Sequence, residues 1–172
     1  MRFVGQCYRA HNPVWSAKPL SGDGAAIRGA RFNPRGLPAL YLSLTIEGAV
    51  TEAAQGFGNR LQPLTICMYE IDCEDIVDLR SDAGRAVHGV TLGEMACAWA
   101  LDLCEGREPA SWRVAKRLRS EGAAGLLAPS FAHHARPDMM NLVLWRWGRD
   151  RPHKVDVHDP SGRLPKDQLS WL

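Results

Sequence analysis

The segment Leu37–Leu44 (LPALYLSL) alternates in polarity and is followed at once by a helical pattern, so it constrains the fold more than any other part of the chain. Its last three leucines fall on one side of an extended chain, whereas Tyr41 and Ser43 fall on the other. Alternation with a period of two is typical of a strand that has one face in the core. We therefore predict a strand here, with Tyr41 and Ser43 on its second face.

The residues after this strand have the pattern of an amphipathic helix. Thr45 is a typical N-cap residue, and Glu47 follows in the first turn, where the helix dipole favours an anion. Glu52 falls about 60° from Ala49 at about 100° per residue, which puts it at the margin of the apolar stripe. Gly56 and Gly58 are predicted to end the helix. The predicted apolar stripe consists of Ile46, Ala49, Val50, Ala53, Ala54 and Phe57.

The rest of the chain mixes strands and helices without a regular βαβ rhythm. Residues 1–36 are rich in Gly, Pro, Arg and small polar residues, which predicts loops with short strands. Thr91 and Glu94 form a capping-box pattern that opens a helix, and a shorter basic helix over Ser111–Arg119 is ended by Gly122. The predicted apolar face of the first helix consists of Leu92, Met95, Ala96, Trp99 and Leu103. Further predicted strands are Pro63–Ile71, Leu126–Pro129, Asn141–Trp147 and Lys154–His158.

Such a mixture favours the α+β class over a doubly wound sheet. The 172 residues suffice for one domain with its own core, so we expect residues 1–172 to form a single domain. A formal net charge of +2 is too small to indicate nucleic-acid binding by itself. The N-terminus lacks the apolar core of a signal peptide, and no apolar run approaches the roughly 18 residues of a membrane span. We therefore expect a cytoplasmic protein.

The cysteines and histidines do not form a recognisable metal or redox motif. The five cysteines contain no C-x-x-C pair, and we expect them to be buried free thiols in a reducing compartment. The histidines at 133, 134, 153 and 158 are interpreted as solvated loop residues, so no metal site is expected. There is no phosphate-binding P-loop and no G-x-G-x-x-G after a strand. The usual nucleotide folds are therefore not supported. Neither is a hydrolase triad, because Ser130 lies outside a G-x-S-x-G elbow.

One stretch of the chain closely resembles the signature of the RES domain family. It is Gly29–Ser43 (GARFNPRGLPALYLS), followed by Glu52 in the predicted helix, beside a family pattern of about G-G-R-[WF]-N-x-x-G-x-P-x-L-Y-x-[AS]. The likeness extends to Tyr8-Arg9, to the LAPS sequence that ends at Ser130, and to Asn141 with the three residues after it. The chain departs from the pattern at Ala30, at Phe32 and in the Asp-Met-Met run before Asn141.

This resemblance implies a fold similar to that of ADP-ribosyltransferase toxins, with a mixed or antiparallel β core flanked by helices. RES proteins are the toxins of bacterial toxin–antitoxin pairs, and their antitoxin is an Xre-like helix-turn-helix protein. Members use NAD⁺ as a substrate and hydrolyse it, phosphorolyse it or transfer its ADP-ribose to a protein. The resemblance therefore implies an antitoxin that blocks the active site and, in the transfer case, a protein target. It implies no direct contact with nucleic acid or a membrane.

The resemblance assigns catalysis to Glu52, Arg31 and Tyr41. Nicotinamide is a good neutral leaving group, so a carboxylate that stabilises the oxocarbenium-like ribose is the main requirement. Arg31 has the forked donor that suits a pyrophosphate, and Tyr41 has a ring that can stack on nicotinamide. The residues implied to bind NAD⁺ are Arg31, Tyr41, Ser130, Ser43, Asn33, Arg9 and Asn141.

Two other functions stay open at this stage. The first is a catalytically weak protein that binds a helix-turn-helix regulator, although a disused pocket would tolerate the loss of Arg31, Tyr41 or Glu52. The second is a toxin directed at nucleic acid, which would need a basic surface. The basic residues that hint at one are Arg113, Lys116, Arg117 and Arg119. They are equally the solvated face of a helix, or a contact for an acidic segment of an antitoxin.

Overall fold

The computed structural model describes residues 1–54 and 62–169, and within them the chain forms one seven-stranded sheet flanked by helices. The strands lie in the order β4-β5-β6-β2-β1-β3-β7, with β4 and β5 parallel and the other pairs antiparallel. This arrangement confirms the predicted α+β class with a mixed sheet. The strands are β1 (Phe3–His11), β2 (Leu40–Ser43), β3 (Thr65–Cys73), β4 (Ile76–Asp78), β5 (Gly125–Pro129), β6 (Met140–Leu144) and β7 (His153–Val157).

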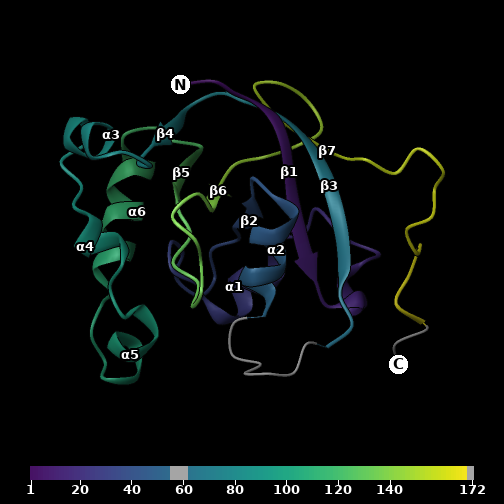
Figure 1. Cartoon of the computed structure of the whole chain (residues 1–172), viewed down its shortest axis with the longest axis horizontal. Helices are drawn as coiled ribbons and strands as arrows, with labels where there is room; N and C mark the ends of the chain where they lie inside the picture. The colour runs from purple at the N-terminus through teal and green to yellow at the C-terminus, as the bar shows by residue number, and fades with distance from the viewer. Residues whose placement is uncertain (55–61, 170–172) are drawn as a thin grey trace.

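The helices are distributed unevenly over the sheet (Figure 1). The segment from α3 to α6 gathers at the end formed by β4 and β5, whereas α1 and α2 lie near β2 in the middle. The helices are α1 (Asp23–Arg28), α2 (Ile46–Ala53), α3 (Asp82–Val87), α4 (Leu92–Met95), α5 (Trp99–Cys104) and α6 (Ala110–Ser120), with a 3-10 turn at Pro13–Trp15. No helix of the described segments is long and apolar enough to cross a membrane. The same residues contain no group of three His, Cys, Asp or Glu side chains that could hold a metal ion.

The predicted strand and helix around Ser43 are confirmed, with small corrections. Leu40 and Leu42 enter one buried cluster, while Tyr41 packs against a second cluster formed with α6. The hydroxyl of Thr45 accepts from the backbone N–H of Gly48 and caps α2 as predicted. Ile46 is 50% exposed, so its predicted place in the core is wrong. It lies in the first turn of α2, directly after the N-cap. Gly56, Phe57 and Gly58 lie outside the described residues.

The prediction of loops with short strands for residues 1–36 is wrong for its first third. β1 is nine residues long and pairs with β3 along its whole length, from Phe3 opposite Cys73 to His11 opposite Thr65. Its conformation is set by this long-range pairing, because its residues show no strong local alternation. α1 was also not predicted.

The capping box of Thr91 and Glu94 is present, but the helix that it opens is one turn long. α4 ends at Met95 and α5 begins at Trp99, so the predicted continuous apolar face to Leu103 is wrong. Of that face, Met95 is fully buried and Leu92 is 47% exposed. Between the two helices the carbonyls of Met95 and Cys97 accept hydrogen bonds from the half-buried side chain of Arg31.

The later elements agree with the prediction to within a few residues. β3, β5, β7 and α6 match their predicted positions, and β6 ends at Leu144 instead of Trp147. Gly122 has a φ of +98° just after α6, as expected of a glycine that ends a helix. Of the five free thiols, Cys7, Cys67 and Cys73 are buried, whereas Cys97 is half-buried. Cys104 is exposed, and its predicted burial is wrong, because α5 lies at the edge of the molecule.

Candidate functional site

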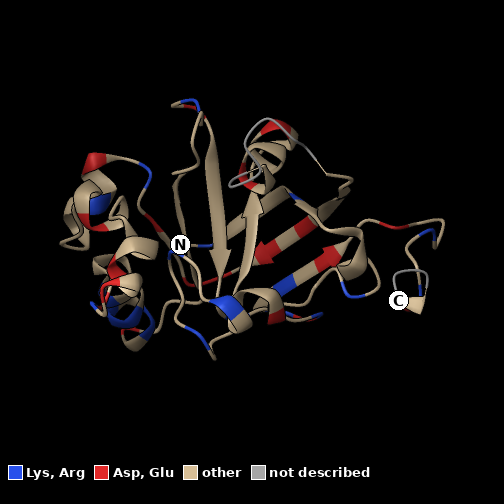
Figure 2. Ribbon diagram, turned by 90° about the horizontal axis from the view of Figure 1, so that it is seen from below, with Lys and Arg blue, Asp and Glu red and all other residues tan. Residues whose placement is uncertain are grey.

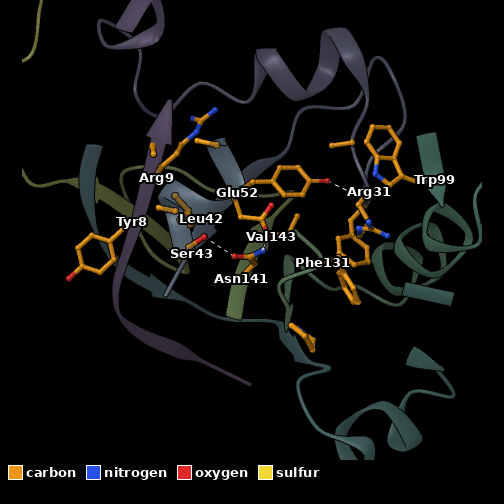
Figure 3. Close-up of a pocket in the computed structure, with 17 residues that line it drawn as sticks. Tyr8, Arg9, Arg31, Leu42, Ser43, Glu52, Trp99, Phe131, Asn141 and Val143 are labelled. Carbon is orange, nitrogen blue, oxygen red and sulfur yellow. Dashed lines mark hydrogen bonds between the residues drawn. The ribbon is translucent and has the colours of Figure 1, made fainter. Parts of the chain in front are cut away.

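A cavity of about 290 Å³ opens where β1 and β2 meet. Within the described residues these two strands pair at Tyr8 opposite Ser43, so the sheet separates on either side of that point. The cavity lies on the face of β2 that carries Tyr41 and Ser43, beneath α2 (Figure 3). Its walls consist of Tyr8, Arg9, Ala10, Ala30, Arg31, Phe32, Tyr41, Leu42, Ser43, Ala49, Glu52, Ala53, Trp99, Pro129, Phe131, Asn141 and Val143.

The carboxylate of Glu52 is held by side chains from the sheet. The hydroxyl of Ser130 and the amide Nδ2 of Asn141 each donate to Glu52 Oε1 at 2.5 Å. Ser43 donates in turn to Asn141 Oδ1 at 2.7 Å, which fixes which end of the amide faces Glu52. Hydrogen bonds to an ionised acceptor are short and about twice as strong as neutral ones. Four side chains thus form one connected group around the carboxylate.

Strand register explains why these residues meet. β2 and β6 are antiparallel with Ser43 opposite Asn141, so the two side chains lie on the same face of the sheet. β5 pairs with the other edge of β6, with Pro129 opposite Met140, and Ser130 follows directly. α2 presents Glu52 to this face together with Ala49 and Ala53. The group therefore joins residues as far as 98 positions apart in the sequence.

Tyr41 lies beside this group, and its hydroxyl is hydrogen-bonded to the loop that precedes β2. Its OH donates to Asn33 Oδ1 at 2.8 Å and accepts from the backbone N–H of Phe32 at 2.9 Å. Burial raises the pKa of Tyr41 well above its ordinary value, so the phenol is neutral. The ring lines the cavity, while the hydroxyl positions the loop that carries Arg31.

Asn33 is fully buried and does not line the cavity. Its amide nitrogen donates to the carbonyls of Ala25, Pro34 and Leu37 at 2.9–3.2 Å. These bonds tie the loop to itself and to α1. Asn33 therefore acts on the cavity through Tyr41 and the loop, and its predicted role as a direct NAD⁺ ligand finds no support in this placement.

The guanidinium of Arg31 lies at the end of the cavity near α4 and α5. Its Nη1 donates to the carbonyl oxygens of Met95 at 2.9 Å and Cys97 at 2.8 Å. Its central carbon lies 4.7 Å from the centre of the Phe131 ring. Burial lowers the pKa of Arg31 while the nearby charge of Glu52 raises it, and an arginine stays protonated at neutral pH. A fixed positive charge therefore faces the cavity.

Arg9 lines the cavity from β1. Its Nη1 donates to the carbonyls of Pro19 at 3.1 Å and Ser21 at 3.0 Å, and this fixes the loop after β1. Figure 3 shows Arg9 and Arg31 on different sides of Glu52. The cavity thus combines a carboxylate with two guanidinium groups.

Most of the predicted site residues come together at this cavity. Arg9, Arg31, Tyr41, Ser43, Glu52 and Asn141 line it, and Ser130 reaches it through Glu52. Trp99 and Phe131 also line the cavity, although the sequence pattern does not indicate them as site residues. Trp99 falls on a predicted apolar helix face, and Phe131 lies in a loop that has no periodic pattern. The feature of the sequence that could have indicated Phe131 is its position directly after Ser130, which ends the LAPS sequence that resembles the RES family.

The basic residues of α6 lie elsewhere. None of Arg113, Lys116, Arg117 and Arg119 lines the cavity, and Arg117 pairs with Glu121 at 3.4 Å. Figure 2 shows acidic and basic segments interspersed over the ribbon. β3 carries Glu70 and Asp72, and the neighbouring β7 carries Lys154. The charges of the described residues therefore give little reason to expect a nucleic-acid surface.

Comparisons with known proteins identify the family and the fold. A model of the RES domain matches residues 6–167. Among solved structures, a chain of the M. tuberculosis MbcT–MbcA toxin–antitoxin complex has a similar fold, with a TM-score of 0.57 and 21% sequence identity. The alignment covers 92% of this chain and 84% of that chain. No curated protein matches the sequence.

Proposed function

The chain belongs to the RES domain family, and from this premise we propose that it is an NAD⁺-consuming toxin that breaks the bond between nicotinamide and ribose. The observation that carries the proposal is the carboxylate of Glu52, held at the cavity by Ser130 and Asn141. Two arginines and aromatic rings surround it, a combination that suits a dinucleotide with two phosphates and a flat leaving group.

The dimensions of the cavity suit one end of NAD⁺. Ligand cavities usually measure about 300–1,000 Å³, and this one is near the lower limit. We infer that the nicotinamide and its ribose enter the cavity, with the ring against Tyr41, and that the adenosine extends outside. The pyrophosphate then lies near Arg31, whose planar fork suits phosphate oxygens.

The proposed reaction needs little acid catalysis. The glycosidic C–N bond breaks and its electron pair neutralises the pyridinium nitrogen, so nicotinamide leaves without protonation. Positive charge develops on the ribose, and the negative charge of Glu52 stabilises it. A nucleophilic atom of water, of phosphate or of a protein side chain then bonds to the anomeric carbon. An ionised phosphate oxygen has no proton to lose, whereas water or a protonated side chain releases one to the solvent.

We further propose that this toxin, residues 1–172 as one domain in the cytoplasm, is held inactive by an Xre-like helix-turn-helix antitoxin that covers the cavity. The similar fold of a chain solved in a toxin–antitoxin complex supports an antitoxin partner. Expression of the toxin alone should arrest growth, and the product of an adjacent gene should relieve the arrest. Arrest that no neighbouring product relieves would contradict this part of the proposal.

A direct assay tests the activity. Purified protein is incubated with NAD⁺, and nicotinamide release is followed with and without phosphate, then with cell extract and labelled NAD⁺. Free ADP-ribose indicates hydrolysis, ADP-ribose 1″-phosphate indicates phosphorolysis, and a labelled protein band indicates transfer. If a folded sample produces none of these, the proposed function is wrong.

A further inference from the structure

We propose that Phe131 is a positioning residue for Arg31, and that this pair sets the affinity of the cavity for NAD⁺; the inference rests on the proposed function. The guanidinium of Arg31 lies over the Phe131 ring at 4.7 Å from its centre. A cation over an aromatic face is attracted by the ring quadrupole, and the attraction grows when water is excluded. The ring itself is supported by Phe32, at 6.4 Å between centres.

One edge of the same guanidinium is held by the backbone. Its Nη1 carries two N–H groups, and these donate to the carbonyls of Met95 and Cys97. The other three N–H groups are on Nε and Nη2, and no described residue in 1–54 or 62–169 accepts from them. The contact with the Phe131 ring and the two hydrogen bonds to the carbonyls fix the orientation of the guanidinium. In this orientation the N–H groups on Nε and Nη2 can donate to a phosphate.

The break between α4 and α5 creates this binding edge. In a continuous helix the carbonyl of Met95 would accept from the N–H of Trp99, four residues later. The N–H of Trp99 instead donates to the carbonyl of Cys97 at 2.8 Å, which leaves the Met95 carbonyl to Arg31. Trp99 begins α5 and also lines the cavity. The two hydrogen bonds of Arg31 therefore hold its guanidinium against the segment between α4 and α5, next to Trp99 in the cavity wall.

Phe131 also lines the cavity, so a direct contact with NAD⁺ is the competing explanation. The two roles differ in what they predict when Arg31 is absent. A positioning residue loses its effect without the group that it positions, whereas a direct contact keeps it.

The test is a double-mutant cycle of Phe131→Leu and Arg31→Met. Dissociation constants for NAD⁺ are measured by calorimetry in a Glu52→Gln background, which leaves NAD⁺ intact. Phe131→Leu should weaken binding by about three- to tenfold, as expected from loss of a cation–π contact. In the Arg31→Met protein the same change should alter binding by less than about twofold. Phe131→Tyr keeps the aromatic face and should restore most of the affinity.

Kinetics and crystallography complete the test. With Glu52 present, Phe131→Leu should raise KM and leave kcat nearly unchanged, and its crystal structure should show a displaced Arg31 guanidinium. Equal effects of Phe131→Leu with and without Arg31, or an unmoved guanidinium, would overturn the inference while leaving the proposed function intact. If the unaltered protein neither binds NAD⁺ nor releases nicotinamide, both proposals fail.

Discussion

The two charged ends of the cavity are built in different ways. Glu52 is held by side chains of Ser43, Asn141 and Ser130, which strand register brings to one face of the sheet. Arg31 is held by two backbone carbonyls at an interrupted helix and by a phenyl ring in a loop. The carboxylate therefore depends on a rigid sheet, and the guanidinium depends on connecting segments.

This contrast separates chemistry from binding. A sheet maintains a small set of groups in fixed positions, as a charge-stabilising carboxylate requires. Loops and short helices adapt to the shape of a ligand and can change with its arrival. We therefore expect changes around Glu52 to act on kcat, and changes around Arg31 to act on KM.

The largest effect is expected for Glu52→Gln. The substitution keeps the shape of the side chain and removes the charge that stabilises the developing cation, so kcat should fall about 100- to 1,000-fold. KM should stay within about threefold, because NAD⁺ binding depends mainly on Arg31 and the rings. Nicotinamide release measures both constants. Glu47→Gln on the same helix is the matched control and should behave like the unaltered protein. Normal kcat in a folded Glu52→Gln protein would remove Glu52 from the chemistry.

A smaller effect, on KM instead of kcat, is expected for Arg31→Met. Loss of charged hydrogen bonds to a phosphate should raise KM for NAD⁺ about 10- to 100-fold, with kcat reduced less than about fivefold. Arg28→Met, in the exposed last turn of α1, is the control for a change in net charge. If Arg31→Met lowers kcat and leaves KM unchanged, the expected division between a catalytic end at Glu52 and a binding end at Arg31 is wrong.

Ser43→Ala tests whether the sheet side chains position Glu52. Without the Ser43 hydroxyl the Asn141 amide loses the hydrogen bond that orients it toward Glu52, so kcat should fall about three- to tenfold with KM constant. Ser16→Ala also removes a buried hydrogen bond, the one to Thr65 at 2.6 Å, but neither Ser16 nor Thr65 lines the cavity. The melting temperature of the Ser16→Ala protein should fall by about as much as that of the Ser43→Ala protein, but its kcat should not change. Equal kinetics for the two variants would mean that Ser43 is structural only.

His11 limits the pH range in which the protein is stable enough for the variants at Glu52 and Arg31 to be compared. It is 7% exposed, and neither ring nitrogen has a hydrogen-bond partner among the described residues. Burial, with a contribution from Arg9, lowers the pKa of His11 to about 4. The unfolded chain, with a histidine pKa of about 6.5, then binds the proton more readily. Stability is therefore complete above about pH 6.5 and is lost as the pH falls toward 4.

At pH 5 this coupling costs about 2 kcal/mol of the free energy of unfolding. Urea unfolding at pH 7.5 and pH 5.0 measures the loss, and His11→Leu should remove most of it. Activity at neutral pH should be the same in both proteins. If the two proteins lose stability equally at low pH, His11 is not the group responsible, and an acidic loss of activity belongs to the site itself.

Local sequence signals predicted one end of the cavity better than the other. The alternation that ends at Ser43, the cap at Thr45 and the helical position of Glu52 are properties of neighbouring residues, and the structure has all three. The resemblance to the RES family added Asn141 and Ser130, which lie in distant segments. The sequence could not show that these two donate to Glu52, because their meeting depends on the order of β5, β6 and β2 in the sheet.

The surroundings of Arg31 were largely missed for a physical reason. The apolar period from Leu92 to Leu103 favours a continuous helix. In the structure the half-buried guanidinium of Arg31 bonds to the carbonyls of Met95 and Cys97, and tertiary contacts of this kind outweigh a local helix preference. Phe131 lies in a loop, where side-chain placement follows tertiary contacts. β1 was missed because it is held by β3, whose pairing residues lie about sixty positions later.

The distance in sequence between Glu52 and its partners also sets a time at which the protein can become active. Glu52 is synthesised 78 residues before Ser130 and 89 residues before Asn141. At translation rates of about 5–20 residues per second, several seconds pass between them. Until β5 and β6 have left the ribosome and paired, the carboxylate lacks its two donors. Synthesis thus leaves an interval in which a partner made at the same time can bind the chain before the proposed catalytic site is complete.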